Sequence, residues 1–129
     1  MALMFATFLL GCERAQQSGS EDQLEKAFIS HSSNVLVTGE GTVSRILSDD
    51  RSGLPHQRFI LRLSSGRTIL IEHNIDIAPR IDDLKVGDSV SFSGEYVWND
   101  QGGLVHWTHH DPAGKHPAGW LKHNGQLYQ

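Results

Sequence analysis

The residues best suited to chemistry gather near the C-terminus, between Leu104 and Trp120. This stretch holds four of the eight histidines and two of the three tryptophans of the chain, and His123 follows three residues later. Imidazole can ligate a metal or transfer a proton near neutral pH, and indole offers a flat apolar surface with one polar group. The sequence therefore predicts that the functional site lies in this stretch.

The histidines can meet only if the strand that carries them ends. On a β-strand His106 and His110 share one face, while His109 lies on the other. Pro112 favours an end near His109, because proline cannot continue the hydrogen-bond ladder and restricts Asp111 before it. At the resulting corner we expect a set of candidate metal or ligand residues to gather: His73, His106, His109, His110, Asp111, His116 and His123.

Three interpretations of this histidine set stay open. Imidazoles with a carboxylate suit a divalent transition metal, zinc foremost, with the carboxylate as a ligand or as a group that orients a ligating histidine. The same groups suit direct ligand binding or acid–base catalysis. They also suit hydrogen bonding to the backbone of an irregular segment. No compact metal signature such as His-Glu-x-x-His is present to decide among them.

Aromatic and basic residues supply two further candidates. A ligand platform could be built from three tryptophans: Trp98, Trp107 and Trp120. Packing in the core or in a lid is the alternative for each of them. A cationic patch could be built from three arginines on a predicted hairpin: Arg58, Arg62 and Arg67. A solvated strand face is the alternative for this patch.

Apolar residues at a period of two predict the strands that must position these residues. A long strand over 35–47 carries Gly39 and Gly41 on its inward side, which is typical of a sharp bend. Further strands are expected at 57–63, 68–73, 89–98 and 104–109, after a short helix that ends near Ser30. We therefore expect a mainly β fold: a five-stranded OB-like barrel with a short N-terminal helix and an irregular C-terminal segment. A small β-sandwich or another β-roll is the alternative.

The N-terminus indicates export. Residues 1–11 are apolar but too few to span a bilayer. They end in Leu-Gly-Cys12, which resembles the bacterial lipobox, in which the cysteine receives the lipid, and Cys12 is the only cysteine. A plain cleaved signal, or a buried helix with an incidental cysteine, is the alternative. The expected organisation is a leader over 1–12, a tether over 13–20 and one domain over 21–129, in a periplasmic or outer-membrane lipoprotein of a Gram-negative bacterium.

Composition excludes some functions. The formal net charge of −4 argues against a general nucleic-acid binder, which needs cations to neutralise phosphates. The chain has no Gly-x-Ser-x-Gly nucleophile motif and no phosphate-binding glycine loop of the Walker or Rossmann type. An oligonucleotide or an oligosaccharide held on the barrel face remains an expected ligand.

Several segments resemble one family of short exported bacterial proteins. These are residues 73–80, the Gly87-Asp88 turn, residues 94–96 and above all the His-Trp-Thr-His-His-Asp-Pro block at 106–112. The family is known as domain of unknown function 3465, and the similarity covers about residues 35–128. The resemblance implies an exported, OB-like domain with a site at the histidine block, but it implies no activity.

The sequence thus leads to one principal hypothesis and two alternatives. The principal one is an exported, lipid-anchored binding module whose histidine-rich C-terminal site holds a ligand or a metal. The first alternative is a metal-dependent phosphodiester hydrolase or nuclease, centred on His109, His110, Asp111 and His116. The second is a structural envelope protein whose histidines brace its C-terminal segment.

Overall fold

The structure is a computed structural model that describes residues 22–129. The leader, Cys12 and the tether therefore lie outside the described residues. Seven strands follow a short helix at 22–29. Their bounds are β1 Val35–Ile46, β2 His56–Arg62, β3 Thr68–Asn74, β4 Ser89–Val97, β5 Leu104–His106, β6 Trp120–His123 and β7 Gln126–Tyr128.

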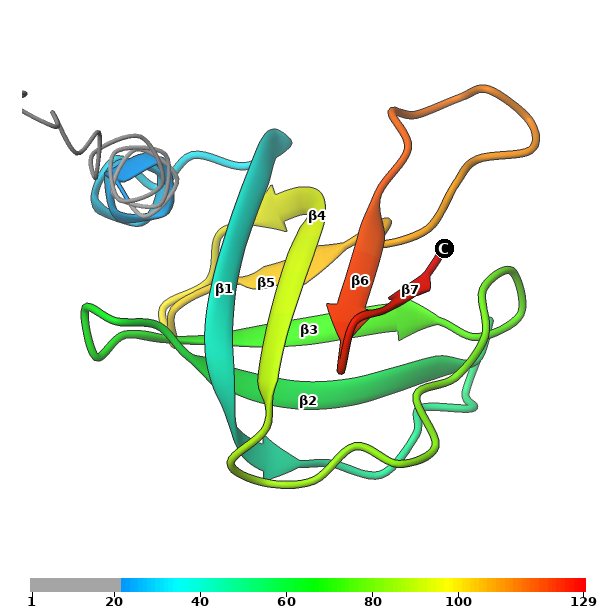
Figure 1. The fold of residues 1–129 in the computed structure, drawn as a ribbon. Helices are drawn as coiled ribbons and strands as arrows, with labels where there is room; N and C mark the ends of the chain where they lie inside the picture. Colours follow the sequence, from blue (N-terminus) through cyan, green and yellow to red (C-terminus); the bar gives the residue numbers. More distant parts are fainter. Residues whose placement is uncertain (1–21) are drawn as a thin grey trace, which may run out of the picture.

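The first five strands close into a barrel (Figure 1). β1 pairs antiparallel with β2 and β4, β2 pairs with β3, and β5 pairs parallel with β3 and antiparallel with β4. The closed order β1-β2-β3-β5-β4-β1 is that of an OB barrel. The predicted five-stranded barrel is confirmed, and the sandwich alternative is wrong.

The long first strand serves both halves of the barrel because it bends. Its first part pairs with β4 as far as Thr42, and its last part pairs with β2, with a register shift between Val43 and Arg45. At Gly39 a Cβ atom would lie 2.7 Å from the ring of Phe92, and at Gly41 it would lie 2.9 Å from the carbonyl oxygen of Arg62. Both glycines therefore allow the barrel wall to close tightly around the bend.

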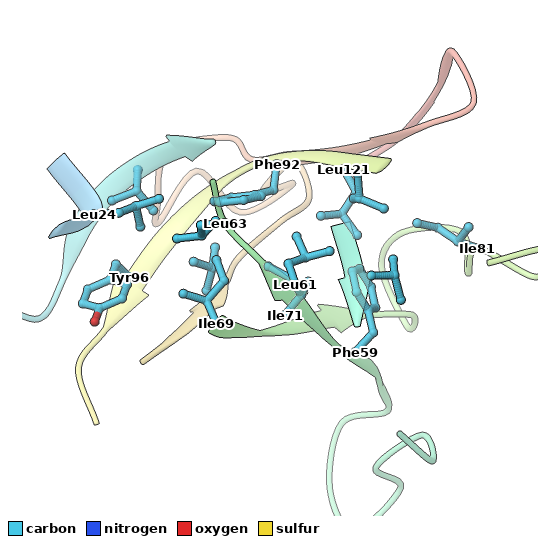
Figure 2. Close-up of a cluster of buried hydrophobic side chains, with 14 of the residues drawn as sticks. Leu24, Phe59, Leu61, Leu63, Ile69, Ile71, Ile81, Phe92, Tyr96 and Leu121 are labelled. Atoms are coloured by element: carbon cyan, nitrogen blue, oxygen red, sulfur yellow. The ribbon is translucent and has the colours of Figure 1, made fainter. Parts of the chain in front are cut away.

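Alternate side chains of the barrel strands form the core (Figure 2). The largest include Phe59, Phe92 and Tyr96, all at most 1% exposed. The helix at 22–29 adds Leu24 and Ala27 to this core. An ion pair outside the core also holds the helix, since Arg67 donates two hydrogen bonds to the Glu25 carboxylate, at 2.8 and 3.0 Å. Within residues 22–129 no helix is long and apolar enough to cross a membrane.

The structure differs from the prediction at the C-terminus. β5 ends at His106 rather than near His109, because Trp107 takes a left-handed backbone conformation with φ of 53°. The irregular segment ends at Gly119, and β6 and β7 then form a hairpin that extends the sheet beside β4. Asn124 and Gly125 form its turn, both at positive φ, as a type I′ turn requires.

Candidate functional site

The histidine block lies in the loop that joins β5 to β6, two short strands that pair with different parts of β4. β5 pairs with residues 95–97 of β4, and β6 pairs with residues 90–93 of the same strand. Between them the chain leaves the sheet at Trp107 and returns at Gly119, and we call residues 107–119 the histidine loop. Its two ends meet where the Gly119 N–H donates to the His109 carbonyl oxygen at 2.9 Å.

Glycines allow this close return. A Cβ atom at Gly119 would lie 2.0 Å from the carbonyl oxygen of Trp107 and 2.6 Å from that of Ser93. A Cβ atom at Gly94 would lie 2.4 Å from the carbonyl oxygen of His106. Real Cβ atoms do not approach backbone oxygens so closely, so the loop base requires glycine at both positions.

The left-handed backbone at Trp107 assembles a stack of rings. In an extended strand neighbouring side chains point to opposite faces, so His106 and Trp107 could not stack. Here their rings are nearly parallel, with centroids 5.0 Å apart. The His116 ring also stacks on the indole, at 4.3 Å, and His109 meets His116 edge-on at 5.2 Å. The stack therefore ties the departing and returning halves of the loop together.

Glu95 holds the outer end of this stack. The His106 Nε2–H donates to Glu95 Oε1 at 2.9 Å across the β4–β5 pair. The Glu95 side chain is only 10% exposed and that of His106 is 27% exposed. The role of Glu95 was missed in the sequence, although its position on the polar face of β4, opposite His106 across a five-residue loop, was a usable signal.

His109 is buried and its side chain bonds to the backbone of its own loop. Its Nδ1–H donates to the carbonyl oxygen of His110 at 2.7 Å. Burial lowers the pKa of His109, and the neighbouring His116 lowers it further. His110 itself is exposed.

Asp111 organises the tip of the loop. Its carboxylate accepts from the backbone N–H groups of three residues: Ala113, Lys115 and His116. Burial raises the pKa of Asp111, but these backbone hydrogen bonds outweigh burial, so the pKa is lowered overall. The His116 Nε2 lies 3.9 Å from this carboxylate, beyond hydrogen-bond distance.

His73 anchors the loop to the barrel. Its Nε2–H donates to the Pro79 carbonyl oxygen at 3.0 Å, because a carbonyl can only accept. Nδ1 must then accept from the hydroxyl of Thr108, at 2.7 Å, and both residues are fully buried. Burial lowers the pKa of His73 to about 4, so the ring is neutral at ordinary pH. Thr108 is a second site residue that the sequence pattern did not single out.

Three further predicted site residues lie outside the ring stack. His123 pairs with Val90, whereas His106 pairs with Glu95, so the two histidines meet β4 five residues apart. Trp98 packs beside the helix, where its Nε1–H donates to the Phe28 carbonyl oxygen at 3.1 Å and its ring stacks on His31. Trp120 begins β6 and is half-buried.

The predicted set is thus brought together only in part. His106, Trp107, His109 and His116 form one cluster of rings, and His73 joins them through Thr108. At least one ring nitrogen of each histidine bonds to a separate protein group. In the part of the chain that the structure describes, no three His, Cys, Asp or Glu side chains are arranged to hold a metal ion.

A continuous apolar row crosses the outer face of the barrel beside this cluster. Cross-strand pairing aligns five side chains on five strands: Arg45, Ile60, Leu70, Leu104 and Val97. The four apolar members are each partly exposed. Neighbouring strands lie about 4.8 Å apart, so the four apolar members follow the curved barrel wall for roughly 14 Å.

A row of mixed charge runs next to it. Arg58 pairs with Glu72, and Glu95 pairs with His106. Glu72 and His106 each lie two residues beyond the Leu70–Leu104 pair, so they occupy neighbouring positions on the same outer face. His106 joins this row to the ring stack of the histidine loop.

The predicted cationic patch is broken up. Arg67 is committed to Glu25 and lies 3.7 Å above the Phe28 ring, so it belongs to the helix contact. Arg58 donates through Nε to the Ser48 carbonyl oxygen at 3.1 Å. Arg62 is exposed on the same face of β2.

Comparison with known proteins agrees with the sequence resemblance. No curated protein matches this chain. A family model described as "Protein of unknown function (DUF3465)" matches residues 6–129, which is nearly the whole chain. The protein is therefore a member of the DUF3465 family.

Proposed function

We propose that this protein is an exported, lipid-anchored binding module that holds an oligosaccharide against the outer face of its barrel, beside the histidine loop. The observation that carries the proposal is the pair of adjacent rows on β2, β3, β5 and β4, one apolar and partly exposed, the other of mixed charge. OB barrels commonly bind extended ligands across these strands, which supports the location by analogy of fold.

The chemistry of the two rows favours a sugar chain. A sugar ring has apolar C–H faces that can pack on Ile60, Leu70 and Leu104, and hydroxyls that both donate and accept. In the neighbouring row the Glu72 carboxylate can accept and the Arg58 guanidinium can donate, while Glu95 and His106 are bonded to each other. A single-stranded nucleic acid instead requires a basic groove with exposed aromatic rings. Here Glu72 and Glu95 would repel its phosphates, and the Trp107 ring is already stacked on two imidazoles.

The arrangement of the histidines supports binding more than hydrolysis. The predicted hydrolytic centre comprises His109, His110, Asp111 and His116. Two of these side chains, His109 and Asp111, instead bond to the backbone of the histidine loop. A hydrolytic centre needs two or more groups within reach of one reacting atom. The metal-dependent alternative stays a prediction, which elemental analysis of the purified protein would test.

Export and anchoring are supported by the sequence of the leader. An apolar run of 11 residues followed by the only cysteine suits a lipobox. We expect metabolic labelling with a fatty-acid analogue to mark the wild-type protein, and Cys12→Ser to abolish the label and release the protein from the membrane fraction. Equal labelling of both would contradict the lipid anchor.

The binding face is tested by Leu70→Asp, which places a charge in the middle of the apolar row. We expect the described domain, expressed without its leader, to bind soluble glycan strands of peptidoglycan in calorimetry. Leu70→Asp should weaken this binding by about tenfold or more, since it loses apolar contact and forces desolvation of a carboxylate.

The matched control is Leu127→Asp on β7, where the side chain is 46% exposed and lies four strands from Leu70 in sheet order. It should bind as the wild type does. Tighter binding of a single-stranded oligonucleotide than of the glycan, or equal losses in the two variants, would overturn the proposal.

A further inference from the structure

A third buried imidazole, His123, lies at the far end of β6 from the histidine loop. The His123 side chain has no exposed surface, and its Nε2–H donates to Asp88 Oδ2 at 2.7 Å. Asp88 is the last residue before β4, and the same oxygen accepts the Lys85 N–H at 3.0 Å. The contact therefore joins the C-terminal hairpin to the β3–β4 connection, which we define as residues 75–88.

The other ring nitrogen of His123 has no hydrogen-bond partner. Among the described residues, Nδ1 is the one buried side-chain nitrogen or oxygen left in this condition. Buried polar atoms are almost always paired, so an exception calls for an explanation. The carboxylate of Asp83 faces this atom, with Oδ1 3.7 Å from Nδ1, and the Asp83 side chain is 67% exposed.

The contact with Asp83 depends on the charge of the ring. In the neutral ring Nε2 carries the hydrogen that Asp88 accepts, so Nδ1 presents a lone pair to a carboxylate that can only accept. In the charged ring both nitrogens donate, and Asp83 becomes a partner. Because Asp83 is mostly exposed, it can turn into water when the ring is neutral.

The other groups around His123 do not compete for Nδ1. The titratable and charged groups near it come from two elements: Asp82, Asp83, Lys85 and Asp88 from the β3–β4 connection, and Tyr128 from β7. Asp82 is paired with Arg80 at 3.1 Å. The residues that pair with His123 on the neighbouring strands, Val90 and Gln126, are uncharged.

We propose that Asp83, Asp88 and His123 form a proton-operated clasp, which fastens the C-terminal hairpin to the β3–β4 connection at both ring nitrogens when the imidazole is charged and at one when it is neutral. β6 follows the histidine loop directly, so the clasp sets how firmly the chain after that loop is held. The device responds to the pH around the protein, and it does not depend on the ligand proposed for the barrel face.

The test is the thermal stability of Asp83→Asn, measured against the wild type at about pH 5.5 and about pH 8.5, on either side of the ordinary imidazole pKa. At the lower pH the variant should unfold a few degrees earlier, because the charged ring loses its second carboxylate. At the higher pH the variant should be no less stable than the wild type, because the amide N–H that it introduces can donate to the neutral Nδ1.

Asp82→Asn is the matched control, since it removes the same charge from the adjacent exposed residue. Its effect should be the same at both pH values. A His123→Asn background supplies a second control, in which Asp83→Asn should lose its pH dependence. A loss in Asp83→Asn that is equal at both pH values, or that Asp82→Asn reproduces, would overturn the clasp.

Discussion

His73 and His123 are both buried, at most 1% exposed, yet their surroundings differ in kind. His73 meets a hydroxyl and a backbone carbonyl, which together satisfy a neutral ring completely. His123 lies between two carboxylates, and a neutral ring there leaves one nitrogen without a partner. The comparison shows that burial alone does not decide the role of a histidine, because the groups that meet its two nitrogens decide whether both can be hydrogen-bonded.

The largest expected effect concerns the neutral histidine. The pKa of His73 is about 4 in the folded protein and about 6.5 in an unfolded chain, so between these values the unfolded state binds the extra proton. The stability contributed by His73 is complete above pH 6.5 and is lost as the pH falls toward 4, by about 3 kcal/mol.

Denaturant unfolding across this pH range would measure the loss in the wild type. The lowered pKa of His109 acts in the same direction. Stability that stays constant from pH 6.5 to pH 4 would show that His73 is not held neutral.

A smaller effect is expected when His73, like His123, is left with one unpaired ring nitrogen. Thr108→Val keeps the shape of the side chain but removes the hydroxyl that donates to His73 Nδ1, so this nitrogen becomes unpaired. We expect the free energy of unfolding at neutral pH to fall by about 1.5 kcal/mol, the cost of leaving a buried acceptor unsatisfied.

His110→Ala serves as the control for this variant, because His110 lies two residues further on and is exposed. It should change stability by less than about 0.5 kcal/mol. A neutral result for Thr108→Val would mean that the histidine loop is not anchored through His73.

Much of the fold could be predicted from the sequence. Alternating apolar residues located the barrel strands to within a few residues, and Gly39 and Gly41 marked the bend of β1. The C-terminal hairpin was missed, although Asn124-Gly125 is the residue pair that type I′ turns favour. The two strands of this hairpin have only four and three residues, which is too short for an alternation of apolar side chains to stand out.

The site could be predicted as a location but not as an arrangement. The histidine block does follow the fifth barrel strand, but that strand ends at His106 and not near His109, where Pro112 had indicated the end. The ring stack of the block depends on the positive φ of Trp107. Tryptophan rarely adopts positive φ, so no local sequence pattern predicts this conformation. The partners of the block, Glu95 on β4 and His73 on β3, are 11 and 35 residues from His106 and Thr108, to which they bond.

By itself the sequence determined the alternation that makes strands, the glycines at the bend of β1 and the positions of the imidazoles along the chain. These are local properties, since they depend on side-chain size, polarity and period within a few residues. Only the tertiary structure decided which imidazole nitrogens face a hydroxyl, a carbonyl or a carboxylate, because closing the barrel brings β3, β4 and β6 together across long separations. Whether both nitrogens of a ring are hydrogen-bonded follows from those partners and therefore could not be read from the histidines alone.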